Sequence, residues 1–442
     1  MPDIIPGEEN RVILVKEMNG LHKEKNKKET LLEVLEPGYM EQFVCTGSLC
    51  PDTCCQGWEI VIDPATCERY EKSSDAELKG LLARAIEHHM EMGPEGPEDV
   101  AAIRQGQGGR CLFLRNDGLC MIQRHTEETN LSETCRTYPR VLYCWNDAYA
   151  ERALCVSCPE AARLILGGDA PLQFVTKRIP TAELDGLRIT DAGEHLLESC
   201  VPLRRELIQI LQDRLLPLRE RLQLADDCFW KMGGLDGHRL RRRLQGALQQ
   251  EEQRRLSLEQ LPPSALPGTA ALRTQLLLLQ QVVSLRLQNP ALRPDFQAAL
   301  QRAARRWQLG GQEPVGEEAV QCFRADRSQY EDVFLPAYGP LLENYLVNGV
   351  FKNIFITDGP APFYREWFRL LLQFSLARLL LIAAAADAAL PPRGDVIELL
   401  RITARAVGHD AAYLQQAEEL LGSEAEVRGF CAAMMSAPEV VF

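Results

Sequence analysis

The sequence predicts a mainly α protein, with a small cysteine-rich α+β module near its N-terminus, stabilised by a metal cluster, and a C-terminal helical bundle. Eleven of the 15 cysteines lie in the first 158 residues, where apolar runs are short. After them the chain is rich in Leu, Ala, Arg and Gln, with apolar residues at helical spacing. We therefore predict a polar N-terminal extension at 1–36, a cluster-binding module at 37–165 and a helical domain at 166–442.

Composition excludes several classes of protein. With 46% hydrophobic and 25% charged residues, the chain is neither disordered, nor collagenous, nor embedded in a membrane. Its net charge of −13 argues against a nucleic-acid partner, because phosphate contacts need clustered positive charge. Residues 1–7 have neither a basic leader nor an apolar core, so we expect a cytoplasmic location and no membrane partner.

The cysteine-rich module shows only short elements. Trp58–Asp63 is apolar enough for one strand, and a helix is predicted over about Ser74–Met92. Residues 112–114 and 119–122 flank the turn sequence Asn116-Asp117-Gly118, which predicts a β-hairpin. A region with so few long elements needs more than apolar burial to hold it together.

The helical domain shows the 3.6-residue period in three long segments. These are Leu203–Leu224, Leu235–Leu258 and Leu272–Gln288. Pro217 is expected to split the first of them, since proline breaks the helical hydrogen-bond pattern.

The most apolar segment is Phe368–Leu390. It contains Arg369, Arg378 and Asp387, and a membrane span seldom tolerates such internal charges. We therefore expect a buried helix of the bundle.

Clustered cysteines in a chain without an export signal predict metal ligands rather than disulfides. Thiolates in this number select iron–sulfur clusters or zinc, and both accept four of them. One Cys-x-x-Cys pair, Cys155 and Cys158, and no His-x-x-x-His argue against a standard zinc finger. The scattered cysteines of the helical half are expected to be small buried residues; they are Cys200, Cys228, Cys322 and Cys431.

Several motifs resemble the flagellin lysine-N-methylases, bacterial enzymes that methylate surface lysines of flagellin. Cys135–Arg140 reads Cys-Arg-Thr-Tyr-Pro-Arg, and Glu343–Asn348 reads Glu-Asn-Tyr-Leu-Val-Asn. The first motif also occurs in a broader set of cysteine-cluster proteins, whereas the second narrows the resemblance to the methylases. The other matching segments are 39–45, 50–58, 111–114, 117–120, 131–134 and 157–162.

The resemblance implies a protein-lysine N-methyltransferase that uses S-adenosylmethionine and a 4Fe–4S cluster, with flagellin as its substrate. Zinc remains the alternative metal. The residues that the resemblance offers as metal ligands are Cys45, Cys50, Cys54, Cys55, Cys111, Cys120, Cys135 and Cys158. One cluster needs four, so some are structural or a second metal is bound.

Lysine methylation needs a neutral amine, so a proton acceptor or a desolvating pocket must act on the lysine. In the matching segment, Glu343 and Tyr345 are the candidate catalytic residues. Alternatively, Tyr345 packs in the helix core while Glu343 faces water. Arg136 and Arg140 are candidates to bind the carboxylate of S-adenosylmethionine; alternatively they pair with acidic neighbours or offset the negative charge of the cluster.

Two common cofactor patterns are absent from the sequence. The glycines at 106–109 follow no strand, so no Rossmann-type turn is predicted. After Cys50 and Cys54, the third cysteine of the radical S-adenosylmethionine spacing would fall at Gly57. Two other functions therefore stay open: a non-catalytic metal- or cluster-binding interaction module, and an iron–sulfur redox protein.

Overall fold

The computed structural model describes residues 31–56, 60–72, 76–93, 96–106, 109–125, 130–184, 187–191, 194–232, 268–289, 292–311, 313–353 and 363–435. The chain forms two compact units. Unit 1 contains Met1–Ala161 and Gln173–Ala192, and unit 2 contains Ala162–Leu172 and Gly193–Phe442. The chain thus leaves unit 1 near the predicted boundary at 165 and then returns to it, which the sequence does not predict.

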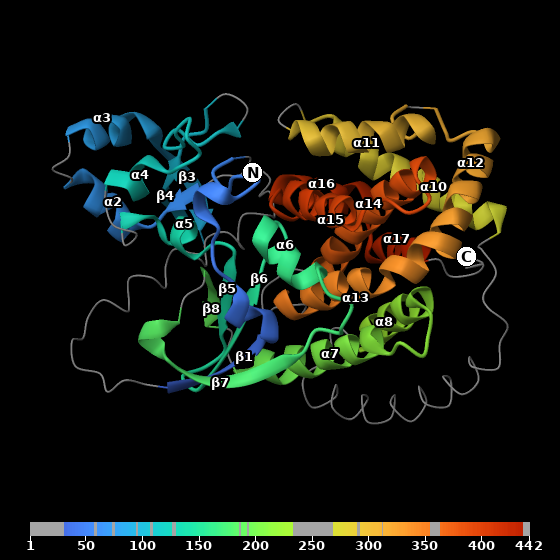
Figure 1. The fold of residues 1–442 in the computed structure, drawn as a ribbon, viewed down its shortest axis with the longest axis horizontal. Helices are drawn as coiled ribbons and strands as arrows, with labels where there is room; N and C mark the ends of the chain where they lie inside the picture. Colours follow the sequence, from blue (N-terminus) through green and yellow to red (C-terminus); the bar gives the residue numbers. More distant parts are fainter. Residues whose placement is uncertain are drawn as a thin grey trace. The chain divides into compact units, whose positions relative to one another are not determined.

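Unit 1 contains a mixed five-stranded sheet with the strand order β7-β1-β6-β5-β8 (Figure 1). β1 pairs in parallel with β6 and antiparallel with β7, while β5 pairs antiparallel with β6 and in parallel with β8. The strands are β1 (Leu31–Pro37), β5 (Arg140–Cys144), β6 (Tyr149–Leu154), β7 (Phe174–Pro180) and β8 (Leu187–Asp191).

The prediction of a polar extension at 1–36 is wrong for its last residues, which form β1. Residues 1–30 lie outside the described residues. Leu32 and Val34 are buried in alternation with exposed neighbours, which is the pattern of a strand with one covered face. Glu36 is also fully buried, and its carboxylate binds Arg152 of β6 at 2.6 Å and Lys177 of β7 at 2.8 Å. The neighbouring strands therefore supply the countercharges that let an acidic residue lie in this sheet.

A second, three-stranded sheet has the order β2-β4-β3. It consists of β2 (Ile60–Ile62), β4 (Gly96–Ile103) and β3 (Ile86–Gly93), and α2 (Pro64–Glu71) and α3 (Ala76–Ala85) precede β3 in the chain. The helix predicted over 74–92 is confirmed only over α3. From Ile86 onward the chain pairs with β4 along the whole length of β3, so strand pairing overrides the local helical pattern.

The predicted hairpin is only partly present. Gly118 has a φ of +80° at the turn, and Leu114 pairs with Cys120 across it. The second arm is wrong beyond that bridge, because Met121–His125 forms the helix α4. The remaining short elements of this region are η2 (Gly38–Gln42), η3 (Gly47–Leu49), α5 (Glu133–Thr137), α6 (Pro159–Leu166) and η6 (Thr181–Glu183).

Unit 2 is built from helices, as predicted. The split at Pro217 is confirmed, since it lies between α7 and α8, and the predicted helix over 272–288 is α10; the segment 235–258 lies outside the described residues. The helices are α7 (Glu194–Gln212), α8 (Leu218–Met232), α10 (Thr269–Leu287), α11 (Pro294–Arg306), α12 (Glu317–Gln329), the π-helix η7 (Tyr330–Phe334), α13 (Leu335–Lys352), α14 (Arg365–Asp387), α15 (Arg393–Gly408), α16 (Ala411–Leu421) and α17 (Glu424–Met435).

α14 corresponds to the predicted buried helix. It is long and apolar enough to cross a membrane by composition alone, but 83% of its most apolar window is buried inside the structure. Its Arg378 is buried as well, with the guanidinium 5.9 Å from the centre of the Phe374 ring and bound to the carbonyl of Met434. α14 therefore serves as a core helix of unit 2.

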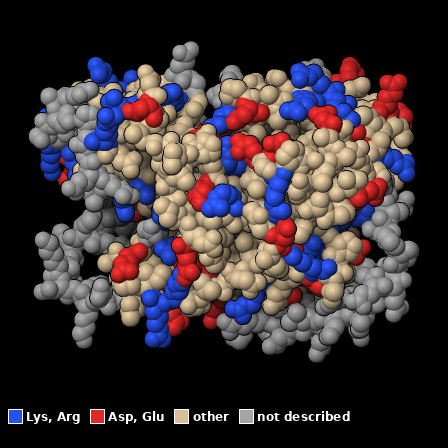
Figure 2. All heavy atoms as spheres, viewed as in Figure 1, with Lys and Arg blue, Asp and Glu red and all other residues tan. Residues whose placement is uncertain are grey.

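On the face shown in Figure 2, acidic and basic side chains are interspersed.

Candidate functional site

Four cysteines of unit 1 form one electrostatic group, which we call the four-thiol group: Cys54, Cys111, Cys120 and Cys135. Burial raises the pKa of Cys111 to about 11 and that of Cys135 to about 12, and it also raises the pKa of Cys120. In each case the charges of other members of the group raise the pKa further. The four thiols are therefore close enough to titrate against one another.

Local backbone contacts place these thiols. The Cys111 N–H donates to the carbonyl oxygen of Cys55 at 2.9 Å, which fixes the Cys54–Cys55 loop against the chain at Cys111. The bridge between Leu114 and Cys120 folds the chain back after Cys111. Cys135 lies in the first turn of α5, where its N–H donates to the Ser132 hydroxyl at 3.2 Å, a typical helix N-cap.

Tyr70 lies in the apolar cluster that surrounds three of these thiols. This cluster contains Cys111 and Tyr70, with Cys120 and Cys135 packed against it. The Tyr70 side chain is only 4% exposed, and its hydroxyl has no hydrogen-bond partner among the described residues. Burial raises the pKa of Tyr70, and the charges of Cys135 and Cys120 raise it further. The described residues around Tyr70 therefore offer its hydroxyl no acceptor. Leaving a buried hydroxyl unsatisfied costs about 1–3 kcal/mol of folding free energy.

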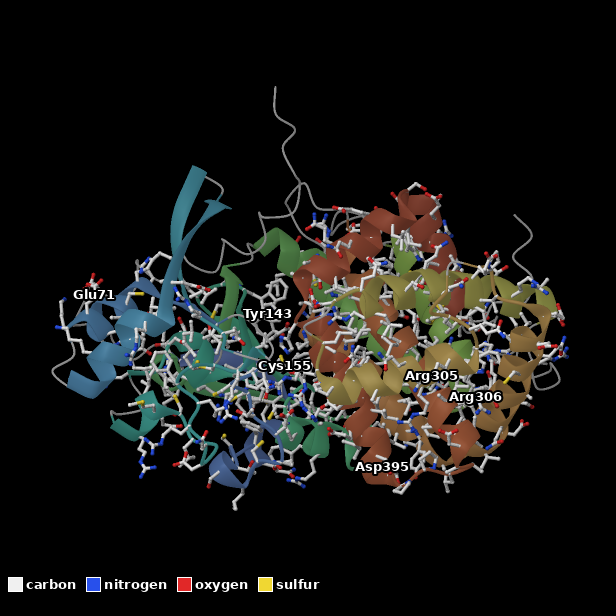
Figure 3. All side chains as sticks on the ribbon, turned by 90° about the horizontal axis from the view of Figure 1, so that it is seen from above. Glu71, Tyr143, Cys155, Arg305, Arg306 and Asp395 are labelled. Carbon is white, nitrogen blue, oxygen red and sulfur yellow. The ribbon has the colours of Figure 1, made fainter. Side chains whose placement is uncertain are left out.

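A second set of thiols contains Cys45, Cys50 and Cys158. Burial raises the pKa of Cys158 to about 12, and the charges of Cys50 and Cys45 add to the rise. The Cys158 N–H donates to the carbonyl of Cys155 at 3.3 Å; Cys155 follows β6 and is labelled in Figure 3. Of the eight predicted ligands, the remaining one, Cys55, belongs to neither set and packs against the apolar cluster.

The choice between an iron–sulfur cluster and zinc at the four-thiol group stays a prediction. Among the described residues, no three His, Cys, Asp or Glu side chains are placed to hold one metal ion. Four thiolates are a ligand set that zinc and iron–sulfur clusters both accept. The unpartnered Tyr70 hydroxyl is compatible with a bound iron–sulfur cluster, because cluster sulfurs accept hydrogen bonds. Stabilisation of unit 1 by a metal stays a prediction.

The two candidate arginines lie on either side of the Tyr138-Pro139 dipeptide. Arg136 is exposed on α5, directly after Cys135. Arg140 begins β5, and its guanidinium lies 4.9 Å from the centre of the Phe43 ring. Arg136 therefore presents its charge to solvent beside the four-thiol group, and the binding role of both arginines stays a prediction.

Glu343 lies on α13 in the interior of unit 2. Its side chain is fully buried, so the alternative in which it faces water is wrong. Arg214 binds it with two parallel hydrogen bonds of 2.9 Å, and Arg221 of α8 binds it at 2.7 Å. Two guanidinium groups thus occupy the carboxylate, which favours a structural role. Its role as a proton acceptor stays a prediction.

Tyr345, the other candidate on α13, is also buried, with 1% of its surface exposed. Its hydroxyl accepts a hydrogen bond of 2.7 Å from the Gln373 side chain of α14, and burial raises its pKa, so the phenol is neutral. Gln373 reaches this position because residue 408 is glycine: a Cβ there would lie 2.5 Å from the Gln373 side-chain oxygen. These contacts are typical of a core tyrosine.

Asp226 is a buried titratable group that the sequence did not single out. On α8 it accepts hydrogen bonds from the indole N–H groups of Trp230, at 3.1 Å, and Trp367, at 2.7 Å. The Phe229 ring stacks on Trp367 at 5.0 Å. Burial raises the pKa of Asp226 to about 6. In the sequence, the only signal for this site is the spacing of Asp226 and Trp230, which lie one helical turn apart. Trp367 is 141 residues away in the chain, so only the fold brings it to Asp226.

We expect Asp226→Asn to stabilise the protein at alkaline pH. Because the pKa rises from 3.8 to about 6 on folding, the folded state binds more protons between these values and loses stability as the pH rises through them. Above pH 6 the cost of the buried charge reaches roughly 3 kcal/mol, and asparagine removes it. Urea unfolding at pH 5 and pH 8 measures the change, with Asp395→Asn as the control, since Asp395 is exposed (Figure 3). An equal effect of Asp226→Asn at both pH values would contradict the expectation.

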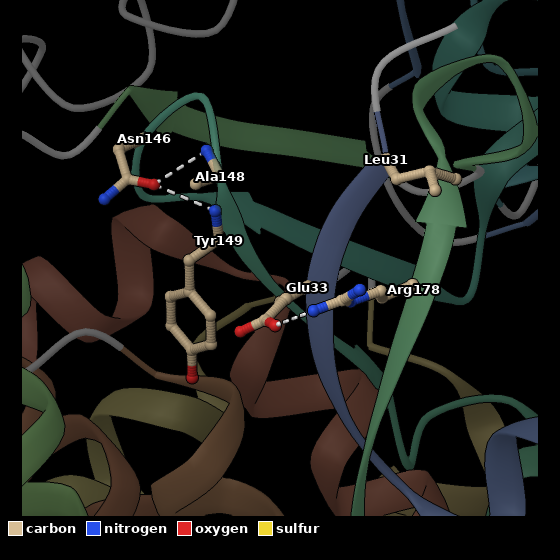
Figure 4. A pocket seen from close by; sticks show the side chains of 6 residues that line it. All are labelled: Leu31, Glu33, Asn146, Ala148, Tyr149 and Arg178. Atoms are coloured by element: carbon tan, nitrogen blue, oxygen red, sulfur yellow. Dashed lines mark hydrogen bonds and ion pairs between the residues drawn. The ribbon is translucent and has the colours of Figure 1, made fainter.

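Unit 1 also has a surface pocket of about 350 Å³ (Figure 4). Its charged groups are paired, with Glu33 and Arg178 3.4 Å apart. The Asn146 side chain accepts hydrogen bonds from the N–H groups of Ala148 and Tyr149. None of the predicted site residues lines this pocket, so it offers no reactive group for the predicted chemistry.

Comparison with known proteins gives one family. The profile of the FliB lysine N-methylase C-terminal domain matches residues 204–431, which is more than half of the chain and lies within unit 2. A protein named lysine-N-methylase, from Salmonella typhimurium, is 28% identical over 167 residues, 38% of this chain and 40% of its own length. The flagellar biosynthetic protein FliU of Salmonella muenchen is 31% identical over 142 residues, 30% of this chain and 78% of its own length.

The alignment to the lysine-N-methylase thus spans less than half of that relative. No solved structure matches the chain. The family profile covers α8 to α16, the C-terminal half of α7 and most of α17, together with the buried Glu343 and Tyr345. The chain therefore belongs to the FliB lysine N-methylase family.

Proposed function

We propose that this protein transfers methyl groups from S-adenosylmethionine to lysine side chains of flagellin, in the cytoplasm before export. The observation that carries the proposal is the family match over residues 204–431. Two relatives add to it, one named lysine-N-methylase and one named a flagellar biosynthetic protein.

The reaction is a displacement at carbon. The neutral lysine nitrogen attacks the sulfonium methyl group, a new C–N bond forms as the S–C bond breaks, and S-adenosylhomocysteine leaves with the electron pair. Lysine has a reference pKa of about 10.4, so its ammonium proton must be removed first. The net charge of −13 raises the encounter rate with a lysine-bearing substrate.

A 4Fe–4S cluster belongs to the proposal, with the four-thiol group as its ligands. When bound, the cluster supplies iron–thiolate bonds and one-electron redox chemistry. In the protein itself, the Ser132 N-cap holds Cys135 at the start of α5, and the Cys55 carbonyl holds the chain at Cys111. The first contact is local, whereas the second holds two distant segments of the group together.

The described groups support separate roles in substrate binding and proton transfer. Arg136, exposed beside the four-thiol group, suits the carboxylate of S-adenosylmethionine, with Arg140 as the second candidate. For the proton, Glu343 and Tyr345 stay the candidates that the resemblance offers, although the Glu343 carboxylate is held by two arginines.

Mass spectrometry of flagellin from cells with and without this protein tests the proposed function. We expect lysines that gain about 14 Da for each methyl group only when the protein is present. The same assay with purified flagellin and S-adenosylmethionine, under anaerobic conditions, separates direct from indirect action.

The alternatives give different results. A non-catalytic cluster-binding module leaves flagellin unmodified and binds a partner instead, and an iron–sulfur redox protein leaves it unmodified while its cluster cycles between oxidation states. Unmodified flagellin in both assays would contradict the proposal.

A further inference from the structure

Tyr70, in the last turn of α2, has a buried hydroxyl with no hydrogen-bond partner among the described residues. Buried hydroxyl groups are almost always hydrogen-bonded. Here only 4% of the side chain is exposed, so bulk solvent does not reach the hydroxyl. Tyr330 has an unpartnered buried hydroxyl as well, so the missing partner of Tyr70 points to a bound acceptor only together with the thiols packed around it.

The position of Tyr70 is fixed relative to the four-thiol group. Asp63 caps α2 by accepting the N–H of Thr66 at 2.8 Å, and its other oxygen accepts the N–H of Glu133 at 3.1 Å, at the start of α5. One carboxylate thus holds together the helix that carries Tyr70 and the helix that carries Cys135. Both side chains belong to the same apolar packing.

The acceptor is identified by the chemistry of the neighbours. Tyr70 and Cys111 lie in one apolar cluster, and Cys120 and Cys135 pack against that cluster. A protonated thiol is a weak acceptor, whereas a thiolate bound to iron carries negative charge and accepts hydrogen bonds readily. The Tyr70 hydroxyl therefore gains a hydrogen-bond acceptor when these thiols become cluster ligands.

We propose that the Tyr70 hydroxyl donates a hydrogen bond to a sulfur of the iron–sulfur cluster, at the side of Cys120 and Cys135, and thereby sets the reduction potential of the cluster. This inference rests on the proposed cluster. A hydrogen bond to a cluster sulfur stabilises the reduced, more negative state, so it raises the potential.

The test is the reduction potential of anaerobically reconstituted full-length protein with Tyr70→Phe. We expect iron and sulfide contents equal to those of the unchanged protein and a more negative midpoint potential in a spectroscopic redox titration. Tyr330→Phe is the matched control, because Tyr330, like Tyr70, is buried with an unpartnered hydroxyl but lies in unit 2. We expect this variant to leave the midpoint potential unchanged. An unchanged potential in Tyr70→Phe, with the cluster retained, would overturn the inference.

A second measurement needs no variant. The Fe–S stretching bands in resonance Raman spectra should shift when the unchanged protein is moved from H₂O to D₂O, because the donated hydroxyl proton exchanges. Tyr70→Phe should lose part of that shift, and a full shift in the variant would contradict the inference. A reconstituted protein with neither iron nor sulfide would instead overturn the proposed cluster itself, so the two failures are distinguishable.

Discussion

Cys135→Ser is expected to abolish cluster binding and to unfold unit 1. Cys135 belongs to the four-thiol group and is packed against the apolar cluster. If four thiolates hold the cluster, three cannot hold it with comparable affinity, and the binding energy of a structural metal centre is folding energy. We expect iron and sulfide to fall from about four of each per chain to near zero. Metal analysis and near-UV circular dichroism measure the two losses.

Cys228→Ser is the matched control, because Cys228 lies on α8 in unit 2 and belongs to neither set of thiols. We expect it to keep the cluster and to lose on the order of 1 kcal/mol of unfolding free energy. Cys45→Ser distinguishes the two sets of thiols, since it leaves the four-thiol group intact. Retention of full iron and sulfide by Cys135→Ser would remove Cys135 from the ligands.

Glu343→Gln is expected to destabilise unit 2 by about 3–5 kcal/mol, the usual result of leaving a buried charge without its partner. Arg221 is only 7% exposed, and its guanidinium would lose its carboxylate. Arg214 would lose one of the two hydrogen bonds of its fork, because glutamine keeps one acceptor oxygen and replaces the other with an NH₂ donor. Chemical denaturation followed by far-UV circular dichroism measures the change, because unit 2 is helical.

Glu317→Gln provides the control for removing an acidic partner of an arginine. Glu317 pairs with Arg273 at the surface, where its side chain is 58% exposed, and such pairs contribute about 0–1 kcal/mol. The same variants separate the structural role of Glu343 from the predicted catalytic one. Normal stability of Glu343→Gln combined with lost methylation of flagellin would establish Glu343 as a catalytic residue and contradict the structural role.

Short-range patterns predicted much of unit 2 and little of unit 1. The helical period located α10, the apolar run at 368–390 located α14, and Pro217 located the break between α7 and α8, because these signals act within one segment of the chain. The same pattern failed at Ile86–Gly93, where β3 is decided by pairing with β4. β7 and β8 were missed because the strands that they pair with lie far earlier in the chain.

The sequence by itself determined that thiols gather in the first 158 residues, that helices follow, and that the motifs resemble the lysine-N-methylases. Only the tertiary structure decided which thiols share one group. Cys50 and Cys54 are close in sequence, yet Cys54 groups with Cys111, Cys120 and Cys135 while Cys50 groups with Cys158. Contacts between distant segments decide this, such as that between the Cys111 N–H and the Cys55 carbonyl.

The same holds for the charges of the buried residues. The sequence placed Glu343 and Tyr345 on one helix, but the burial of Glu343 depends on two arginines more than 100 residues earlier, which bring the countercharge to it. Tyr70 likewise has no signal in its own segment. Its missing hydrogen-bond partner becomes evident only when α2 packs beside the start of α5, because a hydroxyl is unsatisfied only once folding has removed it from water.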